Sequence, residues 1–277
     1  MARYVHEGVE VLVVSCTGGE RGDVLNPALA EDQAVLADII GTRRAEMAKA
    51  AEILGVRHVW LGFEDSGFPS PDEEGNVAPL PTGCFAEVAL ETASAPLVRI
   101  VREFRPHVIT TYDEQGGYPH PDHIRCHEVS MEAFTKSGDP DAYPGEGKAP
   151  WQAAKLYYHQ TFHKARVVAM HEAILAAGQE SPYAEWLANW EDKPEHANLI
   201  TTQVDAAEWF PLRDQALLAH ATQIDPTGRW FLVPMEVQQR TWPTEDYQLA
   251  ESLVETQLPE DDLFAGLRAP LSAKIDA

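Results

Sequence analysis

The sequence predicts an α/β fold in which mostly parallel strands are joined by crossover helices. Two observations predict it: apolar runs of strand length alternate with segments of helix length, and turn residues separate them. Apolar residues make up 44% of the 277-residue chain, a share typical of a globular protein with a core. At roughly 100 to 200 residues per domain, this length predicts one large domain or two small ones.

The expected strands are apolar runs rich in β-branched or aromatic residues. They cover residues 10–16, 58–63, 107–112 and, later in the chain, 155–162. Gly55 occupies the position at which glycine commonly ends a helix, so it marks the end of the first crossover helix. The helices that we expect cover residues 38–54, 90–104, 166–177 and 206–222.

Residues 1–7 are expected to form the last two turns of a helix, which Gly8 ends directly before the first strand. In a parallel α/β sheet such a helix follows an earlier strand, and the sequence contains none before it. Topology alone leaves two alternatives open. Either an earlier strand is absent from this sequence, or a frayed helix caps the edge of the sheet.

The charge of the chain excludes several classes of partner. With 44 acidic and 21 basic residues, the formal net charge is −23. Nucleic acids and anionic lipids are bound by clustered Lys and Arg, so we expect neither as a partner. The expected partner is a small molecule or another protein.

The cysteines and the apolar runs together predict a cytoplasmic protein. Cys16, Cys84 and Cys126 form no CxxC pair and leave an odd thiol, which suits a reducing compartment. No apolar run approaches the ~18 residues that span a bilayer, and the N-terminal residues do not resemble a signal peptide.

The densest polar segment is YDEQGGYPHPDH at 112–123, directly after the third expected strand. Open α/β sheets bind ligands at such strand ends. Pro121 suits the first position of a helix, so His120 precedes the helix and Asp122 and His123 lie in its first turn. The positive helix N-terminus favours neutral imidazole, the form that binds zinc. The alternative is a solvated helix start, because HxxH pairs also occur by chance and catalytic zinc usually needs three protein ligands.

Other polar segments have weaker signals. The glycines of TGGERG at 17–22 allow close approach of a ligand, although a tight strand-to-helix connection explains them equally well. Arg43 is expected on a solvated helix face, and His127 in the core or on the surface. His220 is expected to cap a helix end, and the aromatic residues at 183–190 are assigned to packing.

Five strings stand in a characteristic order: TGGERG, RRAEMAKAAEILGV, LGFEDSG, YDEQGGYPHPDHIRCH and HATQID. Together they resemble the LmbE-like N-acetylglucosaminyl deacetylases and, within that family, the mycothiol S-conjugate amidases. The resemblance extends to about Gly266. It implies a Rossmann-like fold, one zinc ion per chain, and a single hydrolase domain made of a core (1–135) and a C-terminal part that lines the substrate (136–277).

The resemblance also implies roles for individual residues. His123 would be a zinc ligand, and His120 would polarise the amide carbonyl and stabilise the tetrahedral intermediate, assisted by Tyr118 as an oxyanion donor. Asp122 would orient a neighbouring histidine. The residues implied in substrate binding are Glu20, Arg21, Arg43, Asp65, His220 and Gln223.

One departure from the family pattern is large. The family carries an AHPDD motif at the end of its first strand, which supplies a His and an Asp to zinc and another Asp as general base. This sequence lacks the motif, since its early His6 is followed by Glu7 and Gly8. We therefore expect that about 20 to 30 residues, the length of one strand and one helix, precede Met1 in the complete protein.

The resemblance implies a zinc-dependent amidase of thiol-based detoxification. It would cleave mycothiol S-conjugates into an N-acetylcysteine S-conjugate and glucosaminyl inositol. With one of three zinc ligands and no general base, a polypeptide of residues 1–277 alone is expected to bind zinc weakly and turn over negligibly. The alternatives are the deacetylase of mycothiol biosynthesis and a non-catalytic binding protein.

Overall fold

Parallel strand pairs form the centre of the structure, as the sequence predicts. The computed structural model describes residues 1–69, 71–72, 74–190 and 199–268. In one sheet β1 (Leu12–Thr17) pairs in parallel with β2 (Arg57–Phe63). The strand order of the other sheet is β3-β4-β6-β5, with β3 (Val108–Thr111) and β4 (Lys155–His159) parallel and β5 (Thr202–Asp205) and β6 (Thr244–Ser252) antiparallel to their neighbours.

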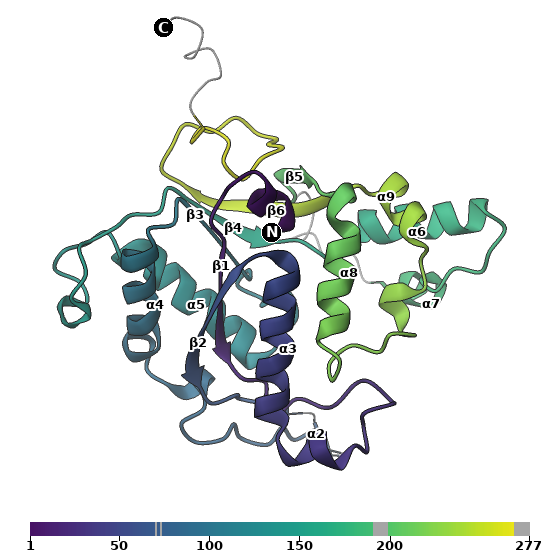
Figure 1. Cartoon of the computed structure of the whole chain (residues 1–277), viewed down its shortest axis with the longest axis horizontal. Coiled ribbons are helices and arrows are strands. Elements are labelled where there is room, and N and C mark those ends of the chain that lie inside the picture. The colour runs from purple at the N-terminus through teal and green to yellow at the C-terminus, as the bar shows by residue number, and fades with distance from the viewer. Residues whose placement is uncertain (70, 73, 191–198, 269–277) are drawn as a thin grey trace, which may run out of the picture.

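Helices pack around both sheets (Figure 1). Helix α4 contacts α5 beside the strands, and α3 contacts α8. None of the helices in the described ranges is long and apolar enough to cross a lipid bilayer. The helix bounds are α1 Ala2–His6, α2 Gln33–Ala37, α3 Ile39–Leu54, α4 Leu90–Phe104, α5 Pro121–Lys136, α6 Lys164–Ala176, α7 Ala184–Ala188, α8 Phe210–Ala219 and α9 Met235–Thr241.

Local signals place the crossover helices well. Asp38 accepts a hydrogen bond from the Gly41 amide and caps the start of α3, and Gly55 ends α3 with a left-handed φ of 70°. The bounds of α4 match the prediction of 90–104. Capping residues therefore mark both ends of α3, whereas α4 begins after Ala89 without a side-chain cap.

The structure corrects two ranges in the second half of the chain. The strand expected over 155–162 ends at His159, where its antiparallel pairing with β6 also ends. The helix expected over 206–222 is limited to α8, which Pro211 helps to start and His220 ends. Strands β5 and β6 were missed, because β5 has only four residues and the nine-residue sequence of β6 is polar and lacks an apolar run.

Strands β1 and β3 stand at the ends of their sheets. In the described part of the chain, β1 is paired only with β2, and β3 only with β4. All six residues of β1 are partly exposed. A central parallel strand would be covered on both faces and both edges.

The N-terminal helix α1 is held against the second sheet. Tyr4 is buried together with Tyr157, Val204 and Leu263. Its hydroxyl donates to Asp262 Oδ1 over 2.9 Å and accepts from the Leu263 amide over 2.9 Å. Helix α1 is therefore anchored by the C-terminal segment, residues 253–268, and is not a frayed end.

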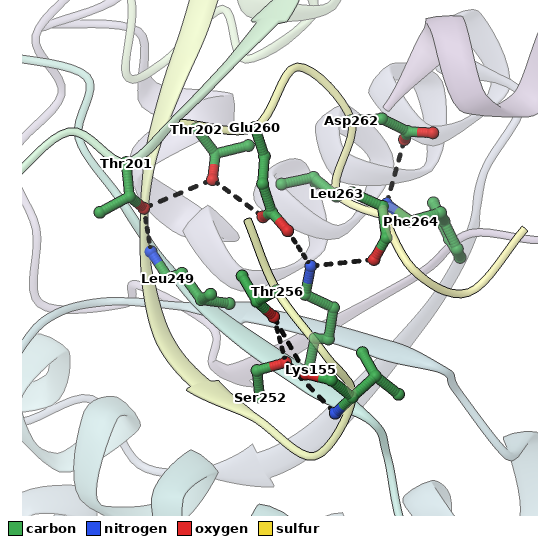
Figure 2. Close-up of polar contacts among 12 residues, drawn as sticks. Lys155, Thr201, Thr202, Leu249, Ser252, Thr256, Glu260, Asp262, Leu263 and Phe264 are labelled. Atoms are coloured by element: carbon green, nitrogen blue, oxygen red, sulfur yellow. Dashed lines mark hydrogen bonds and ion pairs between the residues drawn. The ribbon is translucent and has the colours of Figure 1, made fainter. Parts of the chain in front are cut away.

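A buried ion pair attaches this C-terminal segment to β4 (Figure 2). The fully buried Lys155 Nζ lies 2.5 Å from Glu260 Oε1 and donates to the Ala265 carbonyl over 3.1 Å. Glu260 Oε2 accepts from the hydroxyls of Tyr157 (2.6 Å) and Thr202 (3.3 Å). A buried charge pair persists only when its atoms are hydrogen-bonded in this way.

We expect Lys155→Met to destabilise the protein by about 3–5 kcal/mol, because it leaves the Glu260 carboxylate buried without its cation. Urea unfolding followed by circular dichroism measures the change. The matched control is Lys49→Met, which breaks an exposed pair with Glu52 and should change the unfolding free energy by no more than about 0.5 kcal/mol. Equal effects of the two substitutions would contradict this account.

Candidate active site

The carboxyl ends of β1, β2 and β3 and the start of α5 bring the predicted polar side chains to one edge of the structure. Ligands of open parallel sheets bind at this kind of edge. The residues after β1 supply Glu20 and Arg21, the residues after β2 supply Asp65 and Ser66, and the loop after β3 leads into α5.

The start of α5 is built as the sequence predicts. Pro121 is its first residue, and His120 caps it by accepting a hydrogen bond from the Asp122 amide at Nδ1 over 3.1 Å. Gly116 adopts a left-handed φ of 72°, and a Cβ there would lie 2.8 Å from the His123 Cβ. Glycine at 116 therefore allows the loop to fold tightly against His123.

His123 is held as a neutral imidazole. Its Nδ1 lies 3.0 Å from the Gly116 carbonyl, which can only accept, so Nδ1 carries the proton and Nε2 keeps its lone pair. The Tyr112 ring stacks on it at 4.2 Å between centroids, and the Tyr112 hydroxyl lies 3.4 Å from Nε2. Burial lowers the pKa of His123, and the nearby His120 acts in the same direction.

Two exposed aromatic rings stand over this pair of histidines. Tyr118 is 52% exposed, and its ring centroid lies 4.7 Å from that of His123. Phe68 stacks on His120 at 5.4 Å. Sequence reasoning missed Phe68; its position just beyond the carboxyl end of β2 was the available signal.

Asp122 connects α5 to the end of β2. Its Oδ2 accepts a hydrogen bond from the Ser66 amide over 3.2 Å, while its Oδ1 is buried and has no hydrogen-bond partner in the described part of the chain. Burial raises the pKa of the Asp122 carboxyl. Ser66, also missed from the sequence, is buried and accepts from the Ala86 amide over 3.0 Å.

Glu20, Arg21 and Asp65 form a second group beside the first. The Asp65 amide donates to Glu20 Oε1 over 2.8 Å, and the Arg21 amide donates to Asp65 Oδ2 over 3.2 Å. Arg21 also donates to the Asp65 carbonyl over 2.8 Å and pairs with Glu64. Since Asp65 is adjacent to Ser66, the two groups share one stretch of backbone.

Arg43 corrects an expectation from the sequence. It was expected on a solvated helix face, but only 3% of the residue is exposed. Its Nη2 donates to the carbonyls of Gly22 and Asp23, both over 2.9 Å, and a Cβ at Gly19 or Gly22 would lie 3.1 Å from Nη1. The loop after β1 folds over Arg43, which neither helical periodicity nor residue type reveals.

The turn at 220–223 is attached to α3. Glu46 accepts hydrogen bonds from the Thr222 amide over 2.7 Å and from the Thr222 hydroxyl over 2.8 Å. His220 is the residue at which α8 ends, but burial lowers its pKa and so disfavours the imidazolium that would complement the helix dipole. Gln223 is exposed. The hydrogen bonds from Thr222 to Glu46 attach the turn to α3.

The described residues do not complete a zinc site. His123 fits the role of one ligand, because its Nε2 lone pair is retained. However, no group of three or more His, Cys, Asp or Glu side chains within the described ranges is arranged to hold a metal ion. His127 is directed elsewhere, with Nδ1 3.1 Å from the Tyr112 carbonyl and its ring against Tyr158.

Comparison with known sequences gives a consistent result. The family model PIG-L, described as GlcNAc-PI de-N-acetylase, matches residues 1–134. A mycothiol S-conjugate amidase of Streptomyces coelicolor is 55% identical over 97% of this chain and 91% of its own length. A 1D-myo-inositol 2-acetamido-2-deoxy-alpha-D-glucopyranoside deacetylase of Geodermatophilus obscurus is 40% identical over 96% of this chain and 91% of its own length.

Solved structures share the fold at low sequence identity. An N,N'-diacetylchitobiose deacetylase from Pyrococcus horikoshii matches with a TM-score of 0.58 and 17% identity, over 90% of this chain and 75% of that one. The 4-carboxy-2-hydroxymuconate hydratase GalB from Pseudomonas putida matches with a TM-score of 0.54 and 17% identity, over 93% and 90%. These likenesses confirm the α/β fold class.

Arg43→Lys should loosen the loop after β1, because an ammonium cannot reproduce the fork that holds the Gly22 and Asp23 carbonyls. We expect a loss of about 1–3 kcal/mol in unfolding free energy and faster amide hydrogen exchange in residues 19–23. The neighbouring exposed Arg44 provides the matched control, Arg44→Lys. Unchanged exchange in Arg43→Lys would refute the assigned role.

Proposed function

We propose that the protein is a mycothiol S-conjugate amidase, because the chain belongs to the PIG-L/LmbE family. It hydrolyses the amide that joins the cysteinyl and glucosamine parts of the conjugate. The observation that carries the proposal is the 55% identity to an amidase over 97% of the chain, against 40% or less to the deacetylases compared over similar coverage. The runner-up is the deacetylase reaction on the acetylated glucosaminyl inositol precursor.

The groups at the start of α5 are proposed to act on the scissile amide. Because His120 Nδ1 already accepts from the Asp122 amide, its Nε2 carries the proton and can donate to the amide oxygen. The Tyr118 hydroxyl stands beside the same rings and is proposed as the second donor. Asp122 is proposed to position these groups through its bond to Ser66.

The second group of residues is proposed to bind the sugar part. Glu20 and Arg21 border the edge directly, whereas Asp65 and Arg43 hold loop backbone and are proposed to position that loop. His220 and Gln223 are proposed to border the site from the α8 side. Hydroxyl groups of a sugar are suited to such paired carboxylates and guanidinium groups.

Zinc is the proposed cofactor, with His123 as one ligand. Since the described residues supply no second and third ligand, the chemistry proposed above rests on the protein's own groups. A reducing compartment is proposed as well, because the three cysteines are free thiols.

The proposed function predicts a substrate preference. Protein expressed from its gene in the native host should hydrolyse a mycothiol S-conjugate with kcat/KM at least about tenfold above that for acetylated glucosaminyl inositol. His120→Gln should lower kcat about 10²–10³-fold with little change in KM, because it removes an oxyanion donor. His107→Gln, an exposed histidine before β3, serves as the control. Preference for the acetylated precursor would favour the deacetylase instead.

A polypeptide of residues 1–277 alone is expected to retain far less than one zinc ion per chain after gel filtration, with negligible amidase activity. The reason is that catalytic zinc usually needs three protein ligands and the described residues offer His123 alone. Elemental analysis of the purified polypeptide measures the zinc content. A tight stoichiometric site with substantial turnover would overturn this expectation.

A further inference from the structure

A pocket of about 490 Å³, its open mouth included, lies beyond the carboxyl end of β4. The sequence assigns the aromatic residues at 183–190 to packing, but two of them, Tyr183 and Trp186, line this pocket. The other apolar lining residues are Phe162, Val167, Met170 and Trp230.

The aromatic rings of the pocket contact one another edge to face and leave apolar surface open. The Phe162 ring lies 5.7 Å from Trp230 and 6.3 Å from Trp186. Phe162 is nevertheless 65% exposed. A large apolar side chain held open between two indoles is typical of a binding wall rather than of core packing.

The charged and amide side chains of the wall, those of Arg166 and Gln238, are paired within the protein, so the pocket offers no unpaired charge to a ligand. Arg166 forms an ion pair with Glu245 at 3.2 Å. The Gln238 amide donates to the Val233 carbonyl over 2.9 Å and accepts from Arg213 over 2.8 Å. The pocket therefore suits an uncharged apolar or aromatic group.

One polar atom of the lining residues is left without a partner. In the part of the chain that the structure describes, the Trp230 Nε1 is buried and has no hydrogen-bond acceptor. Buried indole N–H groups usually have one. An acceptor atom on an otherwise apolar ligand would satisfy it.

The pocket and the candidate active site lie at the carboxyl ends of two adjacent parallel strands, β4 and β3. Thr111 of β3 pairs with Tyr158 of β4, so the next residues, Tyr112 and His159, lie on adjacent strands about 5 Å apart. The Tyr112 hydroxyl contacts His123, and Phe162 follows His159 by three residues, at most about 11 Å of extended chain. The pocket therefore lies beside the strand end from which the loop of the candidate site begins.

We propose that this pocket binds the apolar, preferably aromatic, substituent carried on the sulfur of the thiol-conjugate substrate. The inference rests on the proposed amidase function. In such a conjugate the sulfur lies three bonds from the carbonyl carbon that is attacked, so its substituent extends from the catalytic groups toward a neighbouring pocket. The acetylated precursor of the deacetylase reaction carries no corresponding group.

The affinity for two N-acetylcysteine products that differ only in the sulfur substituent tests this role without any turnover. Titration calorimetry on the folded 1–277 chain should show that N-acetyl-S-(naphthylmethyl)cysteine binds at least about tenfold more tightly than N-acetyl-S-methylcysteine, because only the former fills the aromatic pocket. Phe162→Ala and Trp230→Phe should each weaken the naphthylmethyl ligand and leave the methyl ligand unchanged. Phe162 is mostly exposed, so its variant should fold.

The matched control is Leu253→Ala, which truncates a 60% exposed apolar side chain beyond β6. The proposal is overturned if the two ligands bind with equal affinity or if the naphthylmethyl ligand does not bind. It is also overturned if Leu253→Ala lowers the affinity for the naphthylmethyl ligand as much as Phe162→Ala does. Displacement of the naphthylmethyl ligand by glucosaminyl inositol also overturns it, because the pocket would then hold the sugar part.

Turnover by the protein from the native host distinguishes failure of this inference from failure of the proposed function. If the naphthylmethyl and methyl conjugates are hydrolysed with equal kcat/KM, and Phe162→Ala changes neither value, the role of the pocket is refuted. The proposed amidase function is not affected by that result. Hydrolysis of the acetylated precursor without hydrolysis of any S-conjugate would refute the proposed function itself. We expect Phe162→Ala to lower kcat/KM about tenfold for the naphthylmethyl conjugate only.

Discussion

The buried pair of Lys155 and Glu260 is the contact on which the arrangement of the chain ends depends. A lysine in the interior of a sheet needs a counter-charge and acceptors, and here Glu260 and the Ala265 carbonyl of the returning C-terminal segment supply them. That segment in turn holds Tyr4 of α1, directly before β1. The ion pair therefore helps to position β1 relative to β3 and β4. The loops after these strands carry the two groups of site residues, so their relative position is linked to the same ion pair.

The candidate site is organised largely by hydrogen bonds to backbone. Asp65, Asp122 and Arg43 each bind amides or carbonyls of the loops after β1 and β2, which keeps those loops in place. The rings of His120 and Tyr118, which we propose to act on the substrate, contact each other at the start of α5. Burial also sets the charge of the site, because it disfavours imidazolium at His123 and carboxylate at Asp122.

The fold alone does not decide the reaction. Structures with similar folds include a deacetylase and a hydratase, so the reaction has to be argued from the site. The site of this chain brings the rings of His120, Tyr118 and His123 together at the start of α5, and an aromatic pocket lies beyond the end of β4. Because Arg166 of this pocket is paired with Glu245, we propose that the pocket selects its ligand by shape and apolar area and not by charge.

The sequence by itself determined the features that depend on neighbouring residues. These include the parallel strands, the capped helix α3, the start of α5 at Pro121 and the histidines placed there, because strand periodicity and capping act over a few residues. Tertiary structure alone decided three other features. These are the polar strands β5 and β6, the burial of Arg43, and the pocket formed by Phe162, Trp186 and Trp230. Each of these depends on contacts between residues far apart in the chain, which no local pattern records.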